Sequence, residues 1–149
     1  MEARLNPYQL APGAYQALSQ MEAYVKETGL ERPLLELVKT RASQINGCAF
    51  CLAMHTRDAR RAGESEDRLH LLNAWHEAPC YTPRERAALA WTEAVTLVSE
   101  THIPDDVFAE AKQHFTETEL VNLTMAVIAI NGWNRMAIAF RAQPKLDGN

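Results

Sequence analysis

Apolar side chains recur at helical spacing along most of this chain, and prolines, glycines and capping residues separate the apolar runs. No stretch alternates between apolar and polar residues for long enough to form a strand. The pattern predicts helices over residues 12–29, 33–46, 48–63, 65–79, 83–98, 104–115 and 116–140. With 149 residues the chain has the length of one domain, so we expect residues 1–149 to form a single compact all-α bundle.

Two of these helices carry a capping box at their start. Thr82 precedes Glu85 by three residues, with Pro83 at the first helical position, and Thr116 precedes Glu119 in the same way. In a capping box, the threonine hydroxyl and the glutamate carboxylate each bind a backbone N–H of the other residue. These signals therefore define where the two helices begin.

Residues 120–140 are apolar on nearly every side of the last predicted helix, which is typical of a membrane span or of a buried helix. Asn122, Asn131, Asn134 and Arg135 interrupt the apolar run, and such side chains are costly in hydrocarbon. We therefore expect no membrane insertion, but a helix buried in the bundle and at a subunit contact of a homo-oligomer. The polar side chains would then bind partners at these contacts.

The composition narrows the functions that the chain can have. A net charge of −4, with basic residues scattered among acids, excludes the basic surface that binds nucleic acid. Residues 1–7 contain no apolar run, so nothing indicates export and we expect a cytoplasmic protein. The chain has no glycine-rich nucleotide loop, so we expect no bound cofactor, and any nicotinamide would act through a separate reductase.

The most informative motif is Cys48-x-x-Cys51, followed by His55 on the same predicted helix. At ~100° per residue, Cys51 and His55 lie ~300° and ~340° from Cys48, so all three side chains share one face. A break at Asn46-Gly47 places both thiols in the first turn, where unpaired backbone N–H groups and the helix dipole favour a thiolate. Cys51 and His55 are also an i, i+4 pair, which brings an imidazole base within reach of the sulfur.

This layout favours a redox dithiol, and two other interpretations stay open. A zinc site would need a fourth ligand beside Cys48, Cys51 and His55, but the chain has no second Cys-x-x-Cys or histidine pair, so we expect no metal. The two thiols could also be inert core residues. A structural disulfide is disfavoured because cytosolic thiols are kept reduced, and Cys80, the odd cysteine, is expected to be a bystander.

Two physical effects disagree on which thiol would attack an oxidant. The helix dipole favours a thiolate at Cys48 by ~0.3–1 kcal/mol, which is less than one pKa unit. A base contributes roughly 10²- to 10⁴-fold to the rate, and only Cys51 is one turn from His55, so we expect Cys51 to attack. Glu36, on the preceding helix, would orient His55 if the two helices pack antiparallel, or else be a solvated acid.

The combination of Glu36, Cys48, Cys51 and His55 closely resembles the alkylhydroperoxidase D branch of the carboxymuconolactone decarboxylase superfamily. The match is most specific between residues 35 and 63. Members of this branch are all-helical and assemble as trimers or hexamers. The resemblance therefore implies an alkylhydroperoxidase D-like helical bundle in a homo-oligomer of that size.

The resemblance also implies an activity, that of a thiol peroxidase. Cys51 would attack a hydroperoxide, Cys48 would resolve the sulfenic acid into a disulfide, and His55 with Glu36 would move the proton. A dithiol or lipoyl-type reductant would then reopen the disulfide. One position departs from the pattern: the best-known members place a second histidine two residues after the first cysteine, where this chain has Phe50, which cannot relay protons.

Other activities are compatible with parts of the motif. The decarboxylase branch of the superfamily lacks the paired cysteines, so lactone decarboxylation is disfavoured. A protein or lipoyl disulfide oxidoreductase would use the same dithiol on a different oxidant. A non-catalytic oligomeric helical module would instead hold zinc with Cys48, Cys51 and His55.

Overall fold

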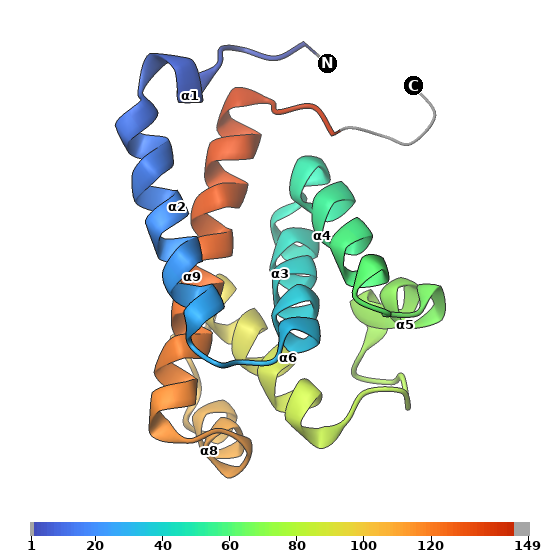
Figure 1. The fold of residues 1–149 in the computed structure, drawn as a ribbon. Coiled ribbons are helices and arrows are strands. Elements are labelled where there is room, and N and C mark those ends of the chain that lie inside the picture. The colour runs from blue at the N-terminus through green and yellow to red at the C-terminus, as the bar shows by residue number, and fades with distance from the viewer. Residues whose placement is uncertain (1, 145–149) are drawn as a thin grey trace.

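A computed structural model describes residues 2–144, which form a bundle of helices (Figure 1). In chain order the helices are α1 (Pro7–Leu10), α2 (Pro12–Glu27), α3 (Arg32–Asn46), α4 (Ala49–Arg61), α5 (Glu66–Leu71), the 3₁₀ helix η1 (Leu72–Ala74), α6 (Pro83–Thr96), α7 (Val98–Thr101), α8 (Asp105–His114) and α9 (Glu117–Phe140). The all-α prediction is confirmed for these residues, which contain no strand. The single domain predicted for residues 1–149 stays a prediction, and its ends lie outside the described residues.

Three helices, α3, α6 and α9, pack against one another at the centre of the bundle. The N-terminal helix α2 lies along α9, and α8 contacts α6 and α9 at the lower end of the bundle (Figure 1). The helix that carries the two cysteines, α4, packs against α3, which precedes it in the chain, and also touches α9. The cysteines therefore lie where α4 meets two of the central helices.

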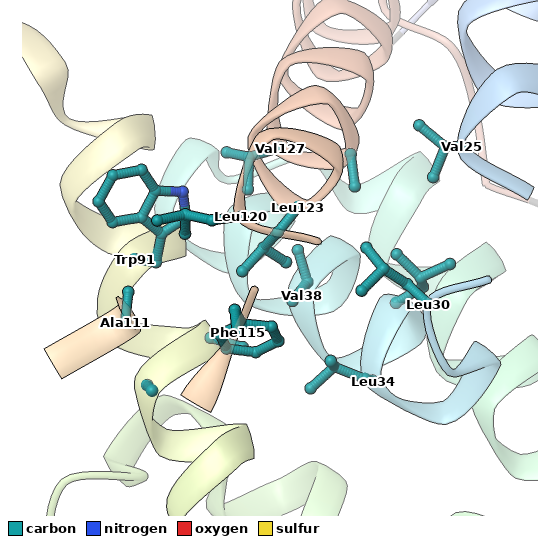
Figure 2. Packing of buried hydrophobic residues seen from close by; sticks show 14 of the residues in the cluster. Val25, Leu30, Leu34, Val38, Trp91, Ala111, Phe115, Leu120, Leu123 and Val127 are labelled. Carbon is teal, nitrogen blue, oxygen red and sulfur yellow. The ribbon is translucent and has the colours of Figure 1, made fainter. Parts of the chain in front are cut away.

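The largest hydrophobic core fills the space between α2, α3, α6, α8 and α9 (Figure 2). Val38 of α3, Trp91 of α6 and Leu123 of α9 are among its buried side chains. Burying an aliphatic or aromatic side chain of this size stabilises the fold by ~1.5–3 kcal/mol. This core holds α3 and α9 in fixed positions, and the cysteine helix packs against both.

Both predicted capping boxes are present. The Thr82 hydroxyl accepts from the Glu85 N–H at 3.2 Å, and the Glu85 carboxylate accepts from the Thr82 N–H at 2.7 Å. The same pair of bonds links Thr116 and Glu119 at 3.2 and 2.8 Å. The starts of α6 and α9 were therefore predictable from four residues.

The helix predicted over residues 65–79 is shorter than expected. It ends as α5 at Leu71 and continues only as the 3₁₀ turn η1. Arg86 on α6 supplies a reason, because its guanidinium donates to the carbonyls of Trp75, His76 and Ala78 at 2.8, 2.8 and 3.2 Å. Because Arg86 donates to these carbonyls, they do not need the N–H groups of a continuing helix, and the helix can end before them.

Two further boundaries differ from the prediction. The helix expected over residues 83–98 ends at Thr96, and Val98 begins the separate short helix α7. The sequence pattern also missed α1, which has only four residues. Asn6 caps α1, and its side-chain oxygen accepts from the N–H groups of Tyr8 and Gln9 at 3.1 and 3.4 Å.

Among the described residues, α9 is the single helix long and apolar enough to cross a membrane by length and composition alone. Core helices of globular proteins pass the same test. In this structure α9 packs against α2, α3, α6 and α8, as expected for the central helix of a bundle. Some of its apolar side chains are nevertheless exposed, including Val121, Ile128 and Ile138.

Candidate functional site

The connection between α3 and α4 determines where the two cysteines lie. Gly47 follows the last residue of α3 and adopts a φ of 68°, in the left-handed region that costs other residues ~1–2 kcal/mol. The Gly47 N–H donates to the Gln44 carbonyl at 3.2 Å, and the Cys48 N–H donates to the Ser43 carbonyl at 3.0 Å. These two bonds form a Schellman motif, which ends α3 and turns the chain directly into α4.

Cys48 is the N-cap residue of α4, and Cys51 lies in its first turn. The sequence predicted both thiols in the first turn, and the structure moves Cys48 one step earlier, to the cap. From there its sulfur accepts from the Cys51 N–H at 3.4 Å and lies 2.8 Å from the Cys51 sulfur. A disulfide bond of about 2.05 Å would therefore require the sulfurs to approach by less than ~1 Å.

The dithiol is buried where α3, α4 and α9 meet. Cys48 and Cys51 are each 1% exposed and pack with Ala42 of α3 and with Ile130 and Ala137 of α9. Water is largely excluded from such a site, so each hydrogen bond to sulfur has a larger electrostatic effect than at the surface.

Phe50 lies between the two cysteines in sequence and packs against the same apolar cluster. The polar side chain expected at this position in the best-known members of the resembled branch is therefore replaced by apolar surface.

The environment separates the pKa values of the two thiols. The S–H of Cys51 donates to the Cys48 sulfur and lowers the pKa of Cys48 to about 7, with burial opposing this shift and the Cys51 N–H supporting it. For Cys51, donation of the same hydrogen bond raises the pKa, and burial raises it further. A single negative charge on the pair therefore belongs mainly to Cys48.

Glu36 and His55 form a second pair beside the dithiol. The Glu36 carboxylate lies 2.9 Å from Nδ1 of His55, and both side chains are buried. Burial alone would raise the pKa of Glu36, but the hydrogen bond and charge of His55, with the charges of Lys39 and Arg32, lower it overall. Glu36 is thus held as a carboxylate against the imidazole, and the alternative of a solvated surface acid does not apply.

His55 follows Cys51 by one helical turn, and both side chains are buried on the inner side of α4. Among the described residues, however, no hydrogen bond joins His55 to either sulfur. The structure therefore brings together Cys48 with Cys51 and Glu36 with His55. The proton contact between the two pairs is not part of this structure.

Two residues near the dithiol were not assigned to the site from the sequence. Tyr8 on α1 has a pKa raised by burial and by electrostatic interaction with Cys51, Tyr15 and Cys48. Asn134 on α9 lowers the pKa of both thiols through its side-chain amide. No sequence signal marks Tyr8, whereas an asparagine in an apolar helix marks Asn134 as a residue that needs partners.

A cavity of about 340 Å³ lies next to Tyr8. Its lining is mostly apolar and comes from the N-terminal segment and the end of α9, namely Ala3, Leu5, Asn6, Pro7, Tyr8, Met136, Phe140 and Ala142. Ala142 also packs against the cluster that surrounds the cysteines. The cavity therefore borders the cluster that contains the dithiol.

Cys80 lies in the segment between η1 and α6, away from the dithiol, and packs against a different core cluster that includes Trp75 and Tyr81. Within residues 2–144, no three His, Cys, Asp or Glu side chains are grouped so that they could hold a metal ion. Two thiolates on one tetrahedral zinc ion lie ~3.8 Å apart, given Zn–S bonds of ~2.3 Å. The separation of 2.8 Å between Cys48 and Cys51 suits a sulfur–sulfur interaction better.

Comparisons with known proteins identify the family and the fold of this chain. The sequence model of the carboxymuconolactone decarboxylase family matches residues 12–94. An uncharacterised protein of Bacillus subtilis, YdfG, is 42% identical over 139 residues, which cover 93% of this chain and 95% of the relative. A crystal structure from Agrobacterium tumefaciens has a TM-score of 0.96 at 44% identity and covers 98% of this chain and 100% of the other. That protein is of unknown function, and its description proposes the antioxidant defence protein AhpD.

Fold and site together define an all-helical protein with a buried Cys-x-x-Cys pair. The chain belongs to the carboxymuconolactone decarboxylase family and is an AhpD-like member of it. The fold by itself does not determine the reaction, since the debrominase Bmp8 shares it with a TM-score of 0.80 at 19% identity, over 90% of this chain and 72% of the other.

The difference between the pKa values of the two thiols leads to a spectroscopic prediction. We expect the ultraviolet thiolate absorbance of the reduced protein to rise through about pH 7, because Cys48 loses its proton there. Cys48→Ala should abolish this rise, and Cys51→Ala should move it to higher pH because the S–H donor to Cys48 is lost. Cys80→Ser serves as the control and should keep the rise near pH 7. A rise that persists unchanged in Cys48→Ala would show that another thiol is the acidic one.

Proposed function

We propose that this protein is a thiol peroxidase of the alkylhydroperoxidase D type, which reduces hydroperoxides with the Cys48 and Cys51 pair. The observation that carries the proposal is the distance of 2.8 Å between the two sulfurs at the start of one helix, with one thiol acidic near neutral pH. Attack on a peroxide needs a thiolate, and turnover needs a second thiol close enough to form a disulfide. The pair meets both requirements.

The first half of the proposed reaction forms a sulfenic acid on Cys51. Cys51 passes its proton to the Cys48 thiolate across their hydrogen bond, and the resulting Cys51 thiolate attacks the terminal peroxide oxygen. The O–O bond breaks, an S–O bond forms, and the leaving alkoxide takes the proton from Cys48 to become an alcohol. This route explains how the more acidic Cys48 and an attacking Cys51 are compatible.

The second half closes the disulfide. The Cys48 thiolate attacks the Cys51 sulfur of the sulfenic acid, an S–S bond forms, and the S–O bond breaks. The departing hydroxide takes a proton from His55, which Glu36 holds in place, and leaves as water. The peroxide has then gained two electrons and two protons; the dithiol has lost two electrons and one proton, and His55 has supplied the second proton. An external dithiol, such as a lipoyl-type reductant, restores the reduced pair by thiol–disulfide exchange.

The burial of the dithiol favours a small oxidant over a large one. Both cysteines are 1% exposed, so the surface disulfide of a folded protein would have no direct access to their sulfurs. The cavity beside Tyr8 is large enough for a small organic molecule, and its mostly apolar lining suits the carbon chain of an organic hydroperoxide. Peroxide reduction is therefore better supported than protein disulfide reduction. A cytoplasmic location is part of the proposal, since thiols are kept reduced there.

The proposal also includes a homo-oligomer, a trimer or hexamer by family resemblance. Apolar side chains exposed on α9, such as Val121 and Ile128, provide a surface that a second copy would cover. We expect light scattering at micromolar concentration to give the mass of an oligomer. A sharp monomer mass would remove this part of the proposal.

The central test of the proposal is the product of peroxide treatment. We expect one equivalent of hydroperoxide to convert Cys48 and Cys51 to an intramolecular disulfide and to leave Cys80 free, because the first two sulfurs are already adjacent. Peptide mapping by mass spectrometry under non-reducing conditions measures this directly. The Cys48→Ser/Cys51→Ser double variant should consume no peroxide. Cys80 as the main disulfide partner in the wild type would contradict the proposal.

A second test assigns the attacking sulfur. We expect Cys51→Ser to abolish peroxide consumption and Cys48→Ser to leave a sulfenic acid on Cys51, which a dimedone-type probe would trap. His55→Ala should slow closure of the disulfide by roughly 10²- to 10⁴-fold, because the proton donor to the departing hydroxide is lost. Cys80→Ser is the matched control and should react at the wild-type rate. If the probe labels Cys48 in Cys51→Ser at the wild-type rate, the two roles are reversed.

A further inference from the structure

Asn134 is a fully buried polar residue on the face of α9 that packs against the dithiol. Its side chain is 0% exposed, and it lies between Ile130 and Ala137, one turn away on either side. Both of these neighbours belong to the apolar cluster that contains Cys48 and Cys51. Asn134 is therefore a polar group inside the apolar wall of the site.

Hydrogen bonds determine which way the Asn134 amide points. Its side-chain oxygen accepts from the amide of Asn46 at 2.9 Å. Its amide nitrogen donates to the hydroxyl of Ser43 at 3.0 Å. Asn46 also donates to Asn131 at 3.0 Å, and Arg135 donates to the same Asn131 oxygen at 2.8 Å, so the orientation of the whole chain of amides is defined. The oxygen of Asn134 faces Asn46, and its NH₂ group faces Ser43.

Ser43 connects this network to the cysteines. Its carbonyl accepts from the Cys48 N–H at 3.0 Å, so the NH₂ group of Asn134 is directed toward the start of α4. An asparagine amide has two N–H donors, and Ser43 takes one of them. Among residues 2–144, the second N–H forms no hydrogen bond to an oxygen or a sulfur, so it is available to the two thiols of the neighbouring cluster. The amide also favours the charged form of both thiols.

We propose that Asn134 is a further residue of the dithiol site, and that its free amide N–H donates to whichever sulfur carries the negative charge. A hydrogen bond to a charged acceptor in a dry site is stronger than one between neutral groups. Once Cys48 has lost its proton, its sulfur becomes the acceptor. During the proposed reaction the charge passes to Cys51 and back, and one amide near both sulfurs can follow it without a large movement. Only this last step rests on the proposed peroxidase function.

The other titratable groups on the elements packed around the pair are Tyr8 on α1, which interacts electrostatically with both thiols, and Glu36 on α3 with His55 on α4, which bind each other. On α9, the charge of Arg135 reaches the network through Asn131. None of these side chains is altered by a substitution at Asn134, so a change in thiol titration would report the loss of the amide donor.

The test measures thiolate absorbance against pH in reduced protein without any peroxide. We expect Asn134→Leu, which keeps the volume and removes the donor, to move the absorbance rise near pH 7 upward by about one unit. Asn134→Asp, which keeps the shape but places an anion beside the sulfurs, should move it at least as far. Asn122→Leu is the matched control, since Asn122 is also buried on α9 but binds Tyr24 at 2.8 Å, and it should leave the rise unchanged.

A rise that stays near pH 7 in folded Asn134→Leu and Asn134→Asp would overturn the proposal and leave Asn134 as a packing residue. If neither variant folds, a measurement on the wild-type protein tests the proposal instead. In protein labelled with ¹⁵N at asparagine, we expect the Asn134 side-chain N–H resonances to shift with the same midpoint as the Cys48 titration. Resonances that do not respond while Cys48 titrates would contradict the proposal. An upward shift in Asn134→Leu with no peroxide turnover in the wild type would refute only the proposed function.

Discussion

The left-handed turn at Gly47 is the constraint on which the candidate site depends. It ends α3 with a Schellman motif and starts α4 one residue later, so Cys48 becomes the N-cap. That position brings its sulfur to the Cys51 N–H and to the Cys51 sulfur at once. Because the turn is so short, α4 folds back beside α3, and His55 meets Glu36 at 2.9 Å. One backbone conformation thus forms both pairs of the site.

Burial gives these pairs their chemical character. Two thiols and a carboxylate in an apolar cluster would be unfavourable unless each had a hydrogen-bond partner. Here the hydrogen bonds of the two sulfurs differ. The Cys48 sulfur accepts hydrogen bonds from the S–H and the N–H of Cys51, whereas the Cys51 sulfur donates one and accepts fewer. The pKa values of the two thiols therefore separate, and Glu36 stays charged beside His55. The amide network from Arg135 to Asn134 extends this polar environment across α9.

Much of the fold and of the site could be predicted from the sequence. Helical periodicity and two capping boxes located most helices, and the spacing of Cys48, Cys51 and His55 identified the reactive face, because these are local features. Features that depend on distant residues were missed. The end of α5 depends on Arg86 of α6, and the approach of Tyr8 depends on α1, a helix too short to show periodicity. Asn134 was recognised as needing a partner, but its position beside the sulfurs required the packing of α9 on α4.

The proposed function requires that Cys48 and Cys51 form a reversible two-electron redox couple. Equilibration of the protein in glutathione buffers of increasing oxidising strength, followed by acid quenching and mass mapping, tests it most directly. We expect one complete transition in which a Cys48–Cys51 disulfide forms and Cys80 keeps its free thiol. Thiols at both Cys48 and Cys51 that stay reduced in the most oxidising buffer, or glutathione bound at Cys80 as the main product, would contradict it.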